Sequence, residues 1–173
     1  MKEIARLKAA MKNDPVTAKL IVPSAINEIY IDLDGDGKAD FAFIGSTESD
    51  EIDTFAFDTT TNGEFNLYIS DTDNNGVEDD IRFFLDGSDV PAEIFKGDKV
   101  ENKLSDLSQA LHQTLKDDFD AKALINAVET YKNGIFKAFE SFQVSATFTS
   151  LKHILMENPA IASTDRKSTR LNS

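Results

Sequence analysis

The residues best suited to chemistry are carboxylates crowded into one short stretch of the chain. Four aspartates stand at positions 1, 3, 5 and 9 of a nine-residue segment: Asp32, Asp34, Asp36 and Asp40. Gly37 at position 6 permits a sharp turn, and Lys38 at position 7 can add its carbonyl oxygen. Calcium in proteins takes six to eight oxygen ligands at about 2.3–2.6 Å. The spacing therefore predicts a calcium-binding loop.

A second stretch repeats the pattern further along the chain. Positions 1, 3, 5, 7 and 9 are filled by Asp71, Asp73, Asn75, Val77 and Asp79, so an amide replaces one acid. The alternative is that both stretches are only acidic turns, because Asp, Asn and Gly favour hairpin turns for backbone reasons. Carboxylates this close repel one another unless a cation lies between them. This repulsion favours the calcium interpretation.

Both stretches resemble the calcium loops of FG-GAP repeats and of thrombospondin type 3 repeats, which share an Asp-x-Asp-x-Asp-Gly-x-x-Asp core. The resemblance covers only Asp32–Asp40 and Asp71–Asp79, and it implies calcium ligands at the matching positions. An EF-hand would carry a bidentate Glu at position 12, where this chain has Phe43 and Arg82. Without that ligand we expect weaker, extracellular-type affinity, on the order of 10⁻⁴–10⁻³ M.

The elements that hold these loops recur every thirteen residues. Position 9 of successive units falls at Asp40, Asp53, Asn66 and Asp79. Each polar turn is followed by a short apolar segment with partial two-residue alternation, which is typical of strands. We expect an α+β protein in which residues 29–90 form an antiparallel β-meander of about five strands. Successive turns then lie at alternate ends of the sheet, so the two metal loops are expected to be separate sites.

Helical spacing surrounds this region on both sides. Residues 1–28 are expected to form an N-terminal helix and a linker, with Ile4, Leu7 and Met11 on one face of the helix. Residues 98–160 form the expected helical region, which should cover one face of the sheet. Its apolar stripes include Val100 to Phe119, a second helix capped by Asp120, and a third near Thr147–Glu157.

Composition excludes several classes of function. The net charge is −13, whereas nucleic acids and anionic membranes are bound by clustered Lys and Arg. The chain has no cysteine, which excludes disulfides and zinc sites built on thiolates. No apolar run is long enough to span a membrane, and no signal peptide is evident at Met1–Lys12. His112 and His153 fit ordinary helix positions, so we expect no catalytic activity.

The C-terminal residues 165–173 resemble a translated sequencing adapter, so the natural sequence is expected to end at or before Thr164. The leading hypothesis is a calcium-binding, non-catalytic structural or adhesive module. We expect it to be a truncated fragment of a bacterial-type surface or secreted protein, because weak calcium loops suit an extracellular setting. The alternative is a protein-interaction or assembly module that uses the helical half and whose acidic turns bind no metal.

Overall fold

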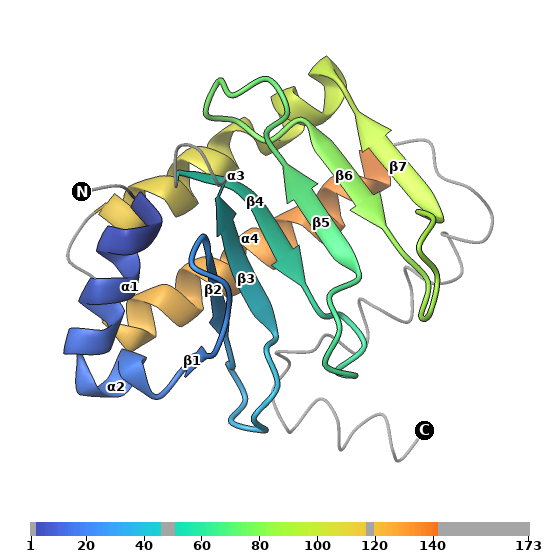
Figure 1. Ribbon diagram of the computed structural model, residues 1–173. Helices are drawn as coiled ribbons and strands as arrows, with labels where there is room; N and C mark the ends of the chain where they lie inside the picture. Colours follow the sequence, from blue (N-terminus) through green and yellow to red (C-terminus); the bar gives the residue numbers. More distant parts are fainter. Residues whose placement is uncertain (1–2, 46–50, 117–119, 142–173) are drawn as a thin grey trace, which may run out of the picture.

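The computed structural model describes residues 3–45, 51–116 and 120–141. These residues form one antiparallel sheet of seven strands, and each strand pairs with the next along the chain (Figure 1). The strands are β1 (Ile21–Val22), β2 (Glu28–Ile31), β3 (Phe41–Gly45), β4 (Ile52–Phe57), β5 (Leu67–Ser70), β6 (Asp80–Phe83) and β7 (Glu93–Lys96). The predicted α+β class and antiparallel meander are therefore confirmed.

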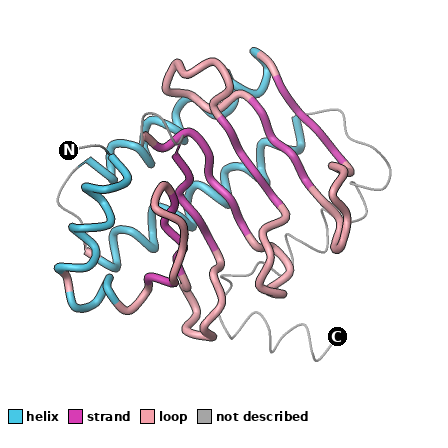
Figure 2. The backbone as a smooth tube through the Cα atoms, viewed as in Figure 1, coloured by secondary structure: helices cyan, strands magenta, loops and turns pink. Residues whose placement is uncertain are grey.

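The three longer helices lie against one face of this sheet. The helical elements are α1 (Glu3–Asn13), α2 (Pro15–Ala18), α3 (Asp98–Lys116), α4 (Ala121–Ala138) and the 3-10 turn η1 (Phe139–Ser141). Figures 1 and 2 show α3 and α4 running behind the strands, while α1 packs beside β2 and β3. The opposite face of the sheet carries no helix among the described residues (Figure 2).

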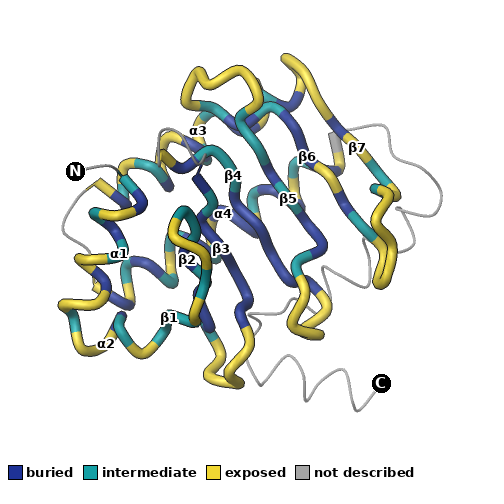
Figure 3. Tube along the Cα trace, viewed as in Figure 1, coloured by how far each residue is buried: buried dark blue, intermediate teal, exposed yellow. Residues whose placement is uncertain are grey.

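The core lies between the sheet and the helices (Figure 3). Alternate residues of the central strands point inward, among them Phe41, Phe43, Phe55 and Phe57, and all four are buried. The facing helices contribute buried residues at helical spacing: Val100, Leu104, Leu111, Leu115, Leu124, Val128, Tyr131 and Ile135. Burial of this apolar surface is the main force that holds helices to sheet.

Two local features determine where α4 begins and how closely it packs on α3. The Asp120 side chain accepts a hydrogen bond from the Ala123 backbone N–H at 2.8 Å, which confirms Asp120 as the N-cap. Gly134 lies where a Cβ atom would come within 2.5 Å of the Leu107 side chain. The glycine therefore lets the two helices approach closely, which offsets its low helix propensity.

The strand count differs from the sequence prediction of about five. The two additional strands are at the edges of the sheet, where β1 is only two residues long and β7 follows Pro91. β1 is too short to show a two-residue alternation, and in β7 the two apolar residues, Ile94 and Phe95, are adjacent, so the sequence pattern does not distinguish either strand from a loop. The predicted N-terminal helix is confirmed, and Ile4, Leu7 and Met11 are fully buried.

Several predicted features lie outside the described residues: Phe119, the helix near Thr147–Glu157, His153 and the segment 165–173. Among the described helices, none combines the length and the apolar composition that crossing a membrane requires.

Candidate metal centre

Three of the hairpin loops share one internal hydrogen-bond pattern: Asp32–Asp40 between β2 and β3, 58–66 between β4 and β5, and Asp71–Asp79 between β5 and β6. In each loop, the aspartate at position 1 accepts a hydrogen bond from the N–H of the glycine at position 6. The donor–acceptor distances are 2.8 Å for Gly37 to Asp32, 2.7 Å for Gly63 to Asp58 and 2.8 Å for Gly76 to Asp71. These bonds curl each loop around its first side chain.

A second bond closes each loop at its other end. The side chain at position 9 accepts from the backbone N–H at position 2. The distances are 2.7 Å for Leu33 to Asp40, 3.0 Å for Thr59 to Asn66 and 2.8 Å for Thr72 to Asp79. In the middle loop the amide oxygen of Asn66 thus accepts the same hydrogen bond that a carboxylate oxygen accepts in the other two loops.

The backbone conformation repeats as well. Positions 4 and 6 of all three loops have positive φ: Gly35 (79°), Gly37 (85°), Thr61 (59°), Gly63 (88°), Asn74 (59°) and Gly76 (90°). Position 6 is glycine throughout, as this backbone region favours. The thirteen-residue repeat is therefore a repeat of loop structure in these three units. The turn of the remaining unit, residues 46–50, lies outside the described residues.

The first loop gathers all four of its predicted carboxylates. Asp32, Asp34, Asp36 and Asp40 each present an oxygen within 4.8 Å of the others. Asp32 and Asp40 are buried at the base of the loop, with Asp40 only 2% exposed, whereas Asp34 and Asp36 are exposed at its tip. This arrangement can surround a cation from several sides while leaving room for water ligands.

The electrostatics of the first loop reflect this crowding. Burial raises the pKa of Asp40 to about 7, the charges of Asp34 and Asp36 add to the rise, and the N–H groups of Leu33 and Asp34 oppose it. Burial also raises the pKa of Asp34, while the Lys38 N–H lowers that of Asp36. Near neutral pH the metal-free loop therefore retains part of a proton that a cation would displace.

The second loop gathers three carboxylates, those of Asp71, Asp73 and Asp79, again within 4.8 Å of one another. It is more open than the first, because Asp73 is exposed and the other two are only partly buried. The pKa of Asp73 is raised, first by partial desolvation among the neighbouring loop atoms and then by its hydrogen bond with Asp71. Asn75 lies in this loop, where its amide nitrogen contacts Glu101 of α3 and its oxygen accepts from the Val77 N–H at 2.9 Å.

Lys38 and Val77 were predicted to supply carbonyl oxygens from position 7. Each stands at the expected place, with its N–H bonded to the side chain at position 5: Lys38 to Asp36 at 2.8 Å and Val77 to Asn75 at 2.9 Å. Coordination by their carbonyls stays a prediction. The two metal loops lie at opposite ends of the sheet (Figure 1), as the alternation of turns predicted.

Sequence reasoning missed a buried polar cluster beneath the second loop. Glu78, at position 8 and 1% exposed, accepts hydrogen bonds from Ser108 of α3 at 2.7 Å and Tyr131 of α4 at 3.1 Å. His112 Nε2 lies 3.6 Å from the other carboxylate oxygen. Burial lowers the pKa of His112, but Glu78 outweighs it, so the net shift is upward. A clue was available, since Ser108 interrupts an otherwise apolar helical stripe.

A second missed feature is Lys132 of α4, which is 1% exposed. Its Nζ has no hydrogen-bond partner among the described residues and lies 5.7 Å from the centre of the Phe136 ring. Burial lowers the pKa of Lys132 to about 8, although the charges of Asp40, Glu129 and Asp58 oppose the shift. A buried cation therefore lies on the side of the core nearest the first loop.

Comparison with known proteins adds no relative. No protein-family model matches the sequence, no curated protein matches it, and no solved structure matches the fold.

Proposed function

We propose that this chain is a non-catalytic calcium-binding module with two separate sites, one in each acidic hairpin loop. The observation that carries the proposal is the convergence of carboxylate oxygens within 4.8 Å in both loops. In the first site Asp32, Asp34, Asp36 and Asp40 are the side-chain ligands. In the second site the side-chain ligands are Asp71, Asp73, Asn75 and Asp79. In both sites the carbonyl at position 7 adds a fifth oxygen, and water supplies the remaining ligands.

The chemistry of the donors favours calcium over other common cations. All side-chain donors are oxygens, which suit hard cations, whereas zinc and copper prefer sites with imidazole or thiolate ligands. Magnesium requires near-ideal octahedral geometry at shorter distances and keeps most of its waters. A loop with carboxylates at alternate positions and an exposed tip better suits the larger and more flexible coordination shell of calcium.

The role proposed for the ions is structural. A cation between the carboxylates removes their mutual repulsion and ties the two ends of a hairpin turn together. A ligand that binds only the folded state stabilises it by mass action, by roughly 1.4 kcal/mol per site at ten times Kd. The expected affinity, on the order of 10⁻⁴–10⁻³ M, matches extracellular calcium modules, so we propose a surface or secreted protein.

An assembly module that uses the helices has less support. Its basis was the set of apolar stripes in the helical region, and in the described part of that region these residues pack against the sheet. Val100, Leu104 and Leu115 are each at most 1% exposed, so they form core rather than a free surface.

A thermal melt of the full chain, treated with chelator and then measured with and without calcium, tests the proposal. We expect calcium to raise Tm by about 5–10 °C when both sites are filled. Asp34→Ala or Asp73→Ala should each remove about half of the rise, while Asp86→Ala, in an exposed loop without a carboxylate cluster, should leave it unchanged. A rise that persists in the Asp34→Ala/Asp73→Ala double variant, or no rise in the wild type, would contradict the assignment.

A further inference from the structure

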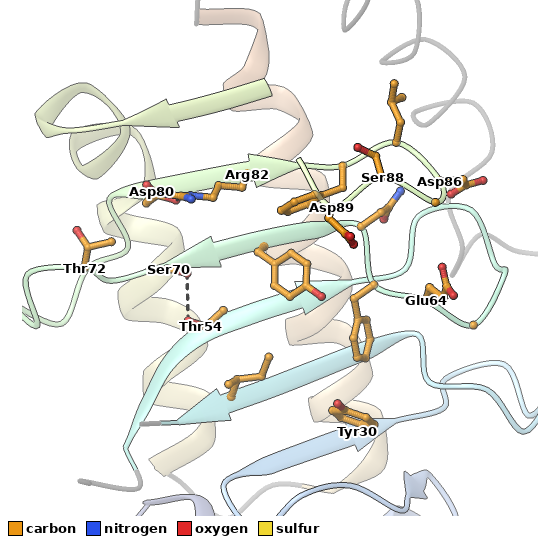
Figure 4. Close-up of a pocket in the computed structure, with 18 residues that line it drawn as sticks. Tyr30, Thr54, Glu64, Ser70, Thr72, Asp80, Arg82, Asp86, Ser88 and Asp89 are labelled. Atoms are coloured by element: carbon orange, nitrogen blue, oxygen red, sulfur yellow. Dashed lines mark hydrogen bonds and ion pairs between the residues drawn. The ribbon is translucent and has the colours of Figure 1, made fainter. Parts of the chain in front are cut away.

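The outer face of the sheet, opposite the helices, carries a row of residues in register across the strands. Tyr30, Ala42, Ala56, Tyr68 and Arg82 lie directly opposite one another on β2 to β6. The two alanines at the centre are fully buried, so the larger side chains around them form the surface of this face. A groove of about 1010 Å³ opens over this face (Figure 4).

Aromatic pairs form the walls of the groove. Phe65 packs against Tyr30 in a T-shaped arrangement with ring centres 5.1 Å apart, and Phe84 packs against Tyr68 in the same way at 5.7 Å. All four rings are only partly buried. The groove therefore presents aromatic ring surface to solvent on the outer face of the sheet.

The groove carries a net negative charge. Its lining includes three exposed carboxylates, those of Glu64, Asp86 and Asp89, together with the buried carboxylate of Asp80 and one cationic side chain, Arg82. Arg82 is already bonded to Asp80, with Nε 3.0 Å from the carboxylate oxygen. Negative charge also affects the walls, since a hydrogen bond with Glu28 raises the pKa of Tyr30 to about 12.

We propose that this groove binds an extended polypeptide segment that carries lysine or arginine side chains. Aromatic rings and carboxylates together recognise cations, the rings through cation–π contacts and the carboxylates through charge. From β2 to β6 the groove crosses four strand spacings, about 19 Å, which accommodates roughly six residues of extended chain. A neutral glycan could also stack on the rings, but it would leave the excess of carboxylates without a counter-charge. The inference is independent of calcium, because the groove does not include the ligands of either loop.

Fluorescence anisotropy of a labelled peptide of alternating lysine and threonine, titrated with the full chain at low ionic strength, tests this proposal. The same peptide with glutamate in place of lysine, and unlabelled cellohexaose as a competitor, serve as probes of charge and of glycan binding. We expect the Asp86→Asn/Asp89→Asn variant to bind the lysine peptide about five- to tenfold more weakly. The control variant Asp106→Asn/Glu140→Gln removes the same charge from exposed helical positions and should bind like wild type.

The aromatic part of the groove has its own test. Tyr68→Ala should lose about tenfold in affinity while Tyr68→Phe keeps it, because the ring face rather than the hydroxyl contacts the cation. Circular dichroism of both variants checks that they are folded. Equal weakening by the groove and control charge variants would show non-specific attraction of a polycation to an acidic protein and would overturn the proposal. Displacement of the peptide by cellohexaose would instead assign the groove to a glycan.

Discussion

The two acidic loops have the same backbone but different surroundings. Both place an aspartate at positions 1, 3 and 9, both bond position 1 to the glycine at position 6, and both have positive φ at positions 4 and 6. The first loop buries Asp32 and Asp40 at its base, whereas the second leaves all three of its aspartates at least partly exposed. Local sequence thus determines the shape of the loop, and the packing beneath it determines its electrostatics.

The residue at position 8 shows this difference most clearly. It is Ala39 in the first loop and Glu78 in the second. The alanine only fills space, while Glu78 binds the second loop to both α3 and α4 through Ser108 and Tyr131. The second loop is therefore fixed to both helices by side-chain hydrogen bonds, whereas Ala39 offers the first loop no such bond.

The largest expected effect concerns this anchor. Glu78→Ala removes a buried carboxylate that two hydroxyl groups donate to, and the hydroxyls would remain buried without a partner. We expect a loss of about 3 kcal/mol in the free energy of unfolding, measured by urea denaturation of the metal-free protein. Glu64→Ala, at an exposed loop position, should change it by less than about 0.5 kcal/mol. A loss for Glu78→Ala as small as the control would show that the cluster does not anchor the loop.

The next effect concerns Lys132 beside the first loop. The pKa of this buried amine is lowered from 10.5 to about 8, so between these values the unfolded chain holds a proton that the folded chain has lost. Stability attributable to Lys132 therefore rises with pH from about 8 to 10.5, and the full cost of the buried charge applies below pH 8. We expect Lys132→Met to stabilise the protein at pH 7 by about 2 kcal/mol, with the gain shrinking as pH rises.

The control for this change is Lys137→Met, which removes an exposed lysine from the same helix. Lys132→Met should also strengthen calcium binding in the first loop, because it removes a positive charge that acts on Asp40, and leave the second loop unchanged. Urea denaturation across pH and calorimetry measure the two effects. Destabilisation by Lys132→Met throughout pH 7–10 would contradict the account of the buried charge.

A smaller effect concerns the charge of the second site. Asn75→Asp, combined with Glu101→Gln so that the new carboxylate does not face the one that Asn75 contacts, gives this loop the same carboxylates as the first, and we expect its calcium affinity to rise about tenfold. The reverse change, Asp36→Asn, should lower the affinity of the first loop by a similar factor. Calorimetric titration of both variants with calcium measures the two affinities. If neither affinity moves, position 5 does not contact the ion.

The smallest effect tests the shared backbone. Gly37→Ala and Gly76→Ala each force a side chain onto a residue with positive φ, although the added Cβ would meet open space. We expect each to cost about 1 kcal/mol of stability, measured by urea denaturation, because only the backbone conformation is penalised. Clearly unequal losses would mean that the two loops differ in conformation after all.

The shape of the loops could be predicted from sequence because the hydrogen bonds that curl and close them are local. The bonds from Gly37 to Asp32 and from Leu33 to Asp40 join residues at most seven positions apart. The central strands were equally accessible, since Phe41 with Phe43 and Phe55 with Phe57 give a clear alternation. Local patterns of this kind survive in a single sequence.

The features that could not be predicted depend on distant parts of the chain. Glu78 meets Ser108 and Tyr131 across 30 and 53 residues, and no local pattern reports such a contact. The outer groove depends on the register that brings Tyr30, Tyr68 and Arg82 into one row, which follows from strand pairing rather than composition. The loops and the buried face together set this register, so the residues that share the outer row could be identified only from the paired strands.

The most direct test of the central claim is a calorimetric titration of the chelator-treated full chain with calcium, which counts the bound ions. We predict two ions for the wild type, one for Asp34→Ala, one for Asp73→Ala and none for the double variant. Absence of binding heat at millimolar calcium, together with an unchanged melting temperature, would contradict the claim and reduce both loops to acidic hairpin turns. Two ions that remain in the double variant would place the calcium sites elsewhere in the molecule.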